Sequence, residues 1–384
     1  MQPSASQYPA RLTQEALYPL AYRYMYLSQV MEGTLLDLFR KGLVKGTVTL
    51  GLGNEATAVG MALPLRPSKD IVSLLHRDLI SHCILGMSVY KVFCQYNANA
   101  ESPTHGREGN VHHGSPQERR LPMMSHLGSM LSPTVGAVHT ARKQGEDVFG
   151  VTVIGDGGAS TGDFHESLNI ASVLGVPVLF LIENNAYAFS TPLSEQYRCE
   201  RLSLRAGSYG VQGRTIDGTD VWEVYRSVCD AFDEMARTSL PYILECDTLR
   251  LNGHAAYDKA DYVTPEEHAR WMKREPVARA RKQLAEACGW SEEKIQTLEA
   301  PVRDEVAEAA QKACSVARPT PQSPPWEIFA APETSRVEPY RASGLTNQRA
   351  VTAALDYILS REPSSFIMGL DVGDRRGSEL RMAE

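Results

Sequence analysis

The sequence predicts an α/β protein with a parallel sheet that is covered by helices on both faces. Three short apolar segments, at 151–154, 176–182 and 242–248, have the length and side-chain composition of buried strands. Segments with helical character separate them, at 160–174 and 220–237. Strands that alternate with helices are typical of parallel βαβ units, because each crossover helix returns the chain to the same sheet edge.

The other elements follow from periodicity and from breaks in it. Apolar residues at helical spacing predict a long helix over 12–42, and charged residues alternate with small apolar ones in a helical region over 266–316. Residues 100–134 are rich in Gly, Pro and His and predict a long irregular loop, which is more often functional than idle. Near the end, 350–359 predict a helix and 365–369 a strand.

The chain of 384 residues is long enough for two domains and a remainder, at a loose prior of one domain per ~150 residues. We assign 12–317 to one α/β domain. Residues 318–334 begin with a Pro-rich stretch that reads as an extended linker. The 50 residues from 335 to 384 are too few to bury much core alone and resemble the opening of a further domain.

Composition narrows the class of protein. The formal net charge is −7, which argues against a chain built to bind nucleic acid through its phosphate backbone. The longest apolar run, 176–182, is far shorter than the ~20 residues that cross a bilayer. Seven scattered cysteines are typical of free thiols in a reducing compartment, and the first residues lack the pattern of a secretory signal. We therefore expect a cytoplasmic protein.

A polar residue follows each of the three predicted strands: Asp156, Asn185 and His254. Ligands of parallel sheets bind beyond the carboxyl ends of the strands, and a βαβ unit returns to one edge after ~30 residues. Asp156 and Asn185 are 29 positions apart, so their oxygens can converge. With a nearby backbone carbonyl such as that of Tyr187, they supply half of an octahedral Mg²⁺ shell, which phosphate oxygens normally complete.

The residues after the first strand fit the same ligand. Gly157 and Gly158 let the backbone approach closely, and the helix that follows offers free N–H groups to an anion. Arg77 can clamp a phosphate, although such an arginine is more often a surface ion pair. Asp-Gly and Asn-Asn are also common turn formers. At this spacing, a diphosphate held through magnesium is the better interpretation.

Three competing motifs overlap this region. Residues 158–162 match G-x-S-x-G, which makes Ser160 a candidate hydrolase nucleophile with His254 as its base, but three residues separate the strand end from the motif. A dinucleotide fingerprint half matches and has Ser160 in place of its third glycine. Several histidines make zinc conceivable, but they lack the spacing of zinc signatures: His76, His105, His112, His113 and His126.

Several segments together resemble a known family. Gly155-Asp-Gly157, then 26 residues, then Asn184-Asn185 resembles the thiamine-diphosphate motif, and the surroundings resemble the alpha subunit of 2-oxo acid dehydrogenases over about 12–317. The segments that carry the likeness are Gly53–Ala56, His76–Arg77, Gly109–His112 and Arg250–His254. Residues 190–198 and 205–210 are most similar to branched-chain members, while pyruvate and acetoin dehydrogenases stay open as alternatives.

The resemblance implies a role for each matching residue. Thiamine diphosphate and Mg²⁺ are the implied cofactors. The implied Mg²⁺ ligands are Asp156, Asn185 and the carbonyl of Tyr187, and the implied contacts to the rest of the cofactor are Arg77, Arg205, Gly157, Gly158 and Gly128. His254 is implied to assist acyl transfer to a lipoyl group, and His112 to lie beside the substrate. The implied partners are a beta subunit, in a heterotetramer, and a lipoyl-bearing acyltransferase.

Some positions depart from the family pattern. Ala255 replaces a regulatory phosphoserine of animal relatives, His76 replaces a usual tyrosine, and Val263 replaces an arginine whose loss leaves the order of its loop in doubt. Residues 345–355 and 366–373 resemble the opening of the family's beta subunit, with Leu370 in place of a common glutamate. We therefore expect an alpha chain fused to part of a beta chain, either active with a beta partner or a non-catalytic remnant at a partner's interface.

Overall fold

The computed structural model describes residues 11–44, 46–320 and 343–367. Compact packing divides the chain into two units, 1–320 and 321–384, which are described separately. The boundary falls inside the predicted linker. All seven cysteines are free thiols. Among the described residues, no helix has the length and apolar character that a bilayer crossing requires.

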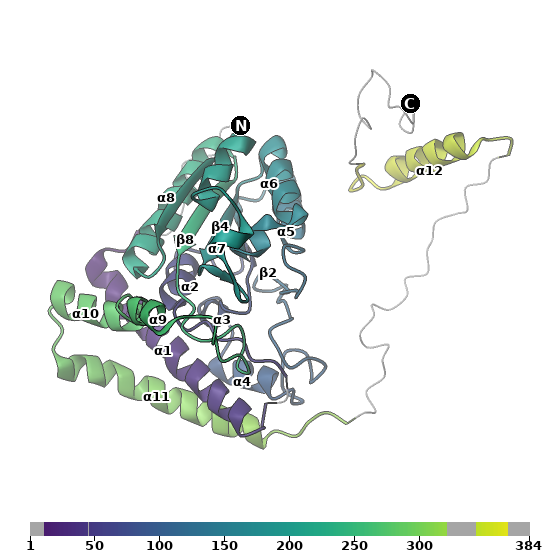
Figure 1. The fold of residues 1–384 in the computed structure, drawn as a ribbon. Helices are drawn as coiled ribbons and strands as arrows, with labels where there is room; N and C mark the ends of the chain where they lie inside the picture. Colours follow the sequence, from purple (N-terminus) through teal and green to yellow (C-terminus); the bar gives the residue numbers. More distant parts are fainter. Residues whose placement is uncertain (1–10, 45, 321–342, 368–384) are drawn as a thin grey trace. The chain divides into compact units, whose positions relative to one another are not determined.

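Within the described part of unit 1, six strands form one parallel sheet in the order β2-β1-β3-β4-β8-β7 (Figure 1). Its strands are β1 (Ile71–Ser73), β2 (Arg120–Leu121), β3 (Gly150–Gly155), β4 (Val178–Asn184), β7 (Gln212–Asp217) and β8 (Tyr242–Asp247). A separate two-stranded hairpin pairs β5 (Tyr187–Ala188) with β6 (Thr191–Pro192). The predicted α/β class is confirmed.

The α-helices of unit 1 are α1 (Gln14–Arg40), α2 (Glu55–Ala62), α3 (Leu79–Ile84), α4 (Val89–Tyr96), α5 (Leu131–Lys143), α6 (Gly162–Leu174), α7 (Leu193–Gln196), α8 (Val221–Thr238), α9 (Pro265–Met272), α10 (Pro276–Cys288) and α11 (Glu292–Ser315). Short 3₁₀ turns lie at Gly158–Ser160 and Leu202–Tyr209. The predicted helical region 266–316 is thus three helices, since the segments between them hold Glu275 and Ser291, which accept hydrogen bonds at the starts of α10 and α11.

Alternating side chains of the central strands build two cores, as period-two geometry requires. Val151, Val153 and Leu181 face α2 and α8. Phe180 and Ile182 face the opposite side, where α5 and α6 pack. Both faces of the sheet are therefore covered, which explains why β3 and β4 are continuous apolar runs rather than alternating ones.

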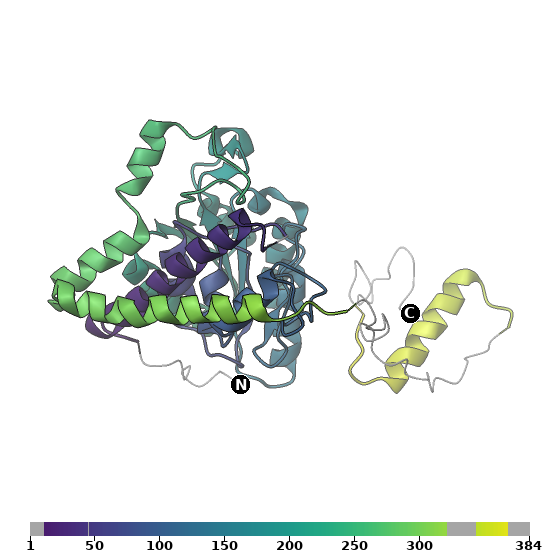
Figure 2. The same cartoon turned by 90° about the horizontal axis from the view of Figure 1, so that it is seen from below.

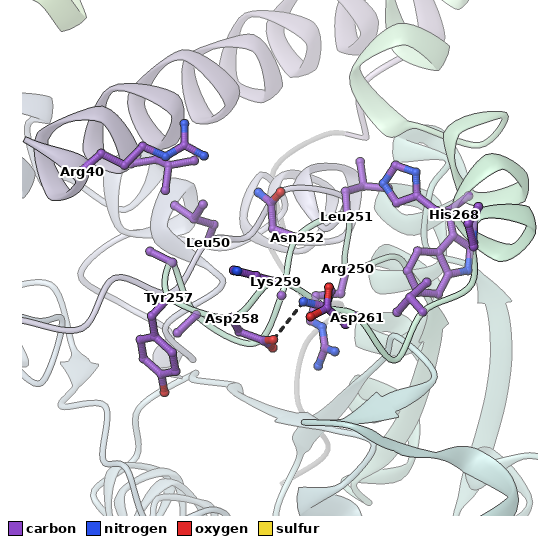
Figure 3. Close-up of a pocket in the computed structure, with 18 of the residues that line it drawn as sticks. Arg40, Leu50, Arg250, Leu251, Asn252, Tyr257, Asp258, Lys259, Asp261 and His268 are labelled. Atoms are coloured by element: carbon purple, nitrogen blue, oxygen red, sulfur yellow. Dashed lines mark hydrogen bonds between the residues drawn. The ribbon is translucent and has the colours of Figure 1, made fainter.

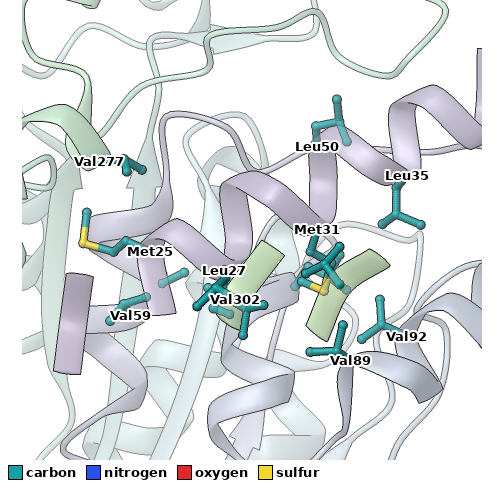
Figure 4. Close-up of a cluster of buried hydrophobic side chains, with 14 of the residues drawn as sticks. Met25, Leu27, Met31, Leu35, Leu50, Val59, Val89, Val92, Val277 and Val302 are labelled. Atoms are coloured by element: carbon teal, nitrogen blue, oxygen red, sulfur yellow. The ribbon is translucent and has the colours of Figure 1, made fainter. Parts of the chain in front are cut away.

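A third core lies among helices. Met25, Leu27, Met31 and Leu35 of α1 pack with Val302 of α11 in a cluster that also takes in residues of α2, α4 and α10 (Figure 4). In Figure 2 the light-green α11 crosses the purple α1, and the two helices pack closely against each other.

Unit 2 is described only over 343–367 and contains α12 (Asn347–Arg361), which the side chain of Thr346 caps. This helix agrees with the one predicted at 350–359. The predicted strand at 365–369 is wrong for its described part, because Ser365 to Ile367 form no strand and the Ser365 N–H donates to the Glu362 carbonyl in a turn. Met368 and Gly369 lie outside the described residues, as do Leu370 and most of the motif at 366–373.

Candidate cofactor site at the carboxyl edge of the sheet

Asp156 and Asn185 follow neighbouring strands, as their spacing predicts. In the register of β3 and β4, Gly155 pairs with Glu183, and the Asp156 N–H donates to the Glu183 carbonyl at 3.2 Å. A backbone hydrogen bond from Asn185 stabilises the Asp156 carboxylate. The structure therefore places the Asp156 carboxylate beside the backbone of Asn185.

Asp156 is the buried acid of this edge. Its side chain is 1% exposed, and burial raises the pKa of its carboxyl group despite hydrogen bonds from Gln196 and the backbone. Gln196 Nε2 donates to Asp156 Oδ2 at 2.8 Å, whereas Gln196 Oε1 is buried and has no hydrogen-bond partner among the described residues. A buried carboxylate beside an orphaned amide oxygen fits a hard cation, which binds oxygen ligands and supplies the missing positive charge.

The turn after β4 holds the other two predicted Mg²⁺ ligands. Ala186 has a φ of 71°, and this conformation lets the Tyr187 N–H donate to Asn185 Oδ1 at 3.3 Å. The Tyr187 carbonyl accepts a hydrogen bond from Arg250 Nη1, also at 3.3 Å. Tyr187 is therefore in place, but its carbonyl already has a protein partner that a metal ion would have to share or displace.

Three glycines of the predicted site lie where an added side chain would meet neighbouring residues. A Cβ on Gly157 would lie 2.6 Å from the Cβ of Ala188, and one on Gly158 would lie 2.6 Å from Ile154 Cδ1. Gly128 has a φ of 87°, and a Cβ there would lie 2.9 Å from Thr161 Oγ1. The turn after β3 therefore touches both the β5–β6 hairpin and the loop before α5, with no space for side chains.

Both predicted diphosphate arginines lie near this edge. Arg77 is buried and donates to the carbonyls of Leu50 at 2.6 Å and His254 at 2.9 Å, so the surface ion-pair interpretation is wrong. Burial lowers the pKa of Arg77 to about 10, which leaves it a cation at neutral pH. Arg205 Nη1 donates to the Ala159 carbonyl at 2.6 Å, in the turn that contains Gly157 and Gly158.

The candidate catalytic histidines occupy two neighbouring loops. His254 has its ring 6.4 Å from that of His76 and 4.7 Å from that of Phe189. Burial, followed by the charges of Arg77 and Arg250, lowers the pKa of His254, so its imidazole is neutral at pH 7. His112 Nε2 lies 2.8 Å from Ser125 Oγ.

The competing motifs are not assembled. Ser160 is exposed, and no hydrogen bond joins it to His254 in the described part of the chain. No group of three metal-ligating side chains of the kinds His, Cys, Asp and Glu gathers among the described residues, so the histidines do not form a zinc site. One of these histidines, His113, is buried with its ring centroid 5.9 Å from that of His82, a pairing that sequence reasoning did not predict.

The loop 250–263 is held by its own side chains. Arg250 Nη2 lies 2.5 Å from the Tyr262 hydroxyl oxygen, which donates to Asp258 Oδ2 at 2.7 Å. Asp258 Oδ2 also accepts the His254 N–H at 2.6 Å. This network orders the loop although Val263 replaces the family's arginine. Figure 3 shows Arg250 and Asp258 among the residues that line a pocket of about 880 Å³ beside α1 and α9.

Comparison with known proteins identifies the family to which this chain belongs. The family model described as "Dehydrogenase E1 component" matches residues 22–322. The chain therefore belongs to this family, the thiamine-diphosphate-dependent E1 components of 2-oxo acid dehydrogenases, and the resemblance drawn from its motifs is confirmed.

Individual relatives narrow the comparison further. The chain is 31% identical over 316 residues to the 2-oxoisovalerate dehydrogenase subunit alpha of Bacillus subtilis, covering 82% of this chain and 92% of that protein. It is 30% identical over 304 residues to the mitochondrial 2-oxoisovalerate dehydrogenase subunit alpha of Mus musculus, covering 78% and 68%. It is also 31% identical over 301 residues to the mitochondrial 2-oxoisovalerate dehydrogenase subunit alpha 1 of Arabidopsis thaliana, covering 78% of this chain and 63% of that protein.

Sequence reasoning missed three residues of the site: Gln196, Arg250 as an anchor of the hairpin, and Phe189. Gln196 and Phe189 lie within or beside the stretch 190–198 that resembles branched-chain members, and Arg250 opens the segment Arg250–His254. Their positions near the motifs were visible, but their contacts join residues as far apart in the sequence as Phe189 and Tyr262 and cannot be read from spacing.

Proposed function

We propose that this chain is the alpha subunit of a branched-chain 2-oxo acid dehydrogenase, which binds thiamine diphosphate through Mg²⁺ and contributes half of an active site. A beta subunit would supply the other half, and a lipoyl-bearing acyltransferase would accept the acyl group. The observation that carries the proposal is the buried Asp156 beside Asn185 and the orphaned Gln196 oxygen at the sheet edge. The names of the relatives support the branched-chain substrate.

The donor set fits the cofactor. Asp156, Asn185 and the Tyr187 carbonyl would hold Mg²⁺, since all three offer oxygen ligands. Arg77 and Arg205 would neutralise the diphosphate, and both arginines donate to backbone carbonyls next to the predicted site residues. When bound, thiamine diphosphate supplies an electron sink for the decarboxylation of a 2-oxo acid.

The protein's own groups then orient substrate and move protons. His254 is neutral at pH 7 because burial lowers its pKa, so one ring nitrogen carries a proton and the other offers a lone pair. Arg77 holds the backbone carbonyl of His254 and so ties this histidine to the diphosphate anchor. His112, with Glu108 and Ser125 around its ring nitrogens, would orient the substrate from the neighbouring loop.

The half-site proposal is tested by measuring CO₂ release from 3-methyl-2-oxobutanoate, with thiamine diphosphate and Mg²⁺ present. We expect negligible turnover by the purified chain and measurable turnover after assembly with a beta subunit. Robust turnover by the chain alone would contradict the proposal. Comparing kcat/KM for the branched-chain acid with those for pyruvate and acetoin separates the three substrate assignments.

A second assay separates this proposal from the hydrolase and remnant alternatives. Fluorophosphonate labelling that is lost in Ser160→Ala would favour a serine hydrolase. Co-purification with a beta subunit in an assembly that binds no cofactor and stays inactive would favour a non-catalytic remnant.

A further inference from the structure

Phe189 is a large apolar residue in an unusual place. It lies at the tip of the β5–β6 hairpin with a φ of 55°, and its side chain is 46% exposed. Non-glycine residues rarely adopt this left-handed conformation, which costs on the order of 1 kcal/mol. Such strain persists only where surrounding contacts hold it, and it often marks a functional position.

Arg250 provides those contacts. Its guanidinium donates to the Phe189 carbonyl from Nη2 at 2.7 Å and to the Tyr187 carbonyl from Nη1. The side chain of Arg250 is only 3% exposed, and it lies over the rings of Tyr187 and Tyr262 at 5.8 and 5.6 Å. The hairpin tip is therefore fixed to the loop 250–263 through a buried cation.

The ring of Phe189 packs against His254. Their centroids are 4.7 Å apart with an interplanar angle of 45°, which is closer than the 6.4 Å between His76 and His254. The His254 backbone N–H is held by Asp258 and its carbonyl by Arg77, but its ring nitrogens have no hydrogen-bond partner among the described residues. Packing, rather than hydrogen bonding, must therefore set the orientation of this imidazole.

We propose that Phe189 is a positioning residue for the acyl-transfer step: its ring holds the imidazole of His254 in one orientation at the mouth of the cofactor site. The inference rests on the proposed function, because it assumes that His254 assists transfer of the acyl group. It adds a residue that neither the motifs nor the family resemblance assigned, and it explains why an exposed aromatic ring occupies a strained turn.

The first test measures His254 directly and needs no activity. The purified chain is treated with diethylpyrocarbonate at pH 7, and carbethoxylation of His254 is followed by peptide mass spectrometry. We expect Phe189→Ala to speed modification of His254 about threefold or more, because the covering ring is removed. Phe189→Tyr keeps the ring and should match the wild type, as should Leu43→Ala, which removes a similarly exposed apolar side chain (47%) elsewhere. An unchanged His254 rate in Phe189→Ala overturns the inference.

The second test separates positioning from general damage to the site. In the assembled complex, decarboxylation is measured with an artificial electron acceptor, and acyl transfer with a lipoyl domain. We expect Phe189→Ala to lower kcat for acyl transfer about tenfold more than it lowers kcat for decarboxylation, because a small misplacement of a reacting group slows the step in which that group takes part. An equal fall in both reactions would contradict positioning. If the wild-type complex transfers no acyl group, the proposed function is wrong. The carbethoxylation rates still show whether the ring of Phe189 covers His254.

Discussion

Replacing Gly157 by Ala tests how tightly the site is built. The φ and ψ of Gly157 are −62° and −41°, which any residue adopts, so the backbone does not oppose the change. The new Cβ would lie 2.6 Å from the Cβ of Ala188, whereas ordinary contacts begin near 3.4 Å. The turn after β3 and the hairpin that carries Tyr187 must then separate by almost 1 Å. Overpacking of this size costs about 1–3 kcal/mol.

The matched control is the double variant Gly157→Ala/Ala188→Gly, which removes the opposing methyl group. The next atoms, Ala188 Cα at 3.5 Å and Gln196 Oε1 at 3.9 Å, are then at ordinary contact distance. We expect a lower thermal midpoint and about tenfold weaker thiamine diphosphate binding for the single variant, measured by differential scanning and isothermal titration calorimetry. The double variant should recover most of both. If the single variant behaves like the wild type, the close approach is not real.

Three further outcomes follow from burial and hydrogen bonding. Burial lowers the pKa of His113 to about 4, below the ~6.5 of an unfolded chain, so the protein loses stability as the pH falls below 6.5. Between pH 7 and pH 5, the unfolding free energy measured in urea should fall by about 2 kcal/mol more in the wild type than in His113→Gln, and equal losses would contradict this. Phe164→Ala should lower the free energy of unfolding by about 3–5 kcal/mol, because this side chain is buried. Val173→Ala, at a position 75% exposed on the same helix, should change it by less than about 0.5 kcal/mol, and similar costs for the two variants would show that Phe164 is not a core residue. Tyr262→Phe removes the hydroxyl that links the loop 250–263, so trypsin should cleave after Lys259 several times faster, and an unchanged rate would show that this hydroxyl does not order the loop.

Strands buried on both faces were the easiest part of the fold to predict. β3 and β4 are continuous apolar runs, and their neighbouring register follows from βαβ spacing. The edge strand β7 gave no such signal, because Gln212 and Gly213 are exposed and its partner is β8 alone. The strands β1 and β2 are only three and two residues long, so the sequence alone did not predict them either, and they depend on pairing with neighbouring strands.

The residues of the site also fall into those that the sequence predicts and those that it does not. Asp156 and Asn185 were predicted because they directly follow paired strands, so local sequence determines their position. The roles of Gln196, Arg250 and Phe189 depend on contacts between loops, such as the 2.7 Å bond from Arg250 to the Phe189 carbonyl. No periodicity encodes these contacts. His82 and His113 are a further case, since their pairing depends on how the loop between α4 and β2, which carries His113, folds back on α3.

The central claim is that the sheet edge binds a diphosphate through Mg²⁺. Its most direct test is calorimetric titration of thiamine diphosphate into the chain assembled with a beta subunit, with Mg²⁺ and with a chelator. We predict binding that requires Mg²⁺ and weakens about 100-fold or more in Asp156→Ala, while Asp304→Ala, an exposed acid on α11, binds like the wild type. Tight binding by Asp156→Ala, or binding unaffected by the chelator, would contradict the claim.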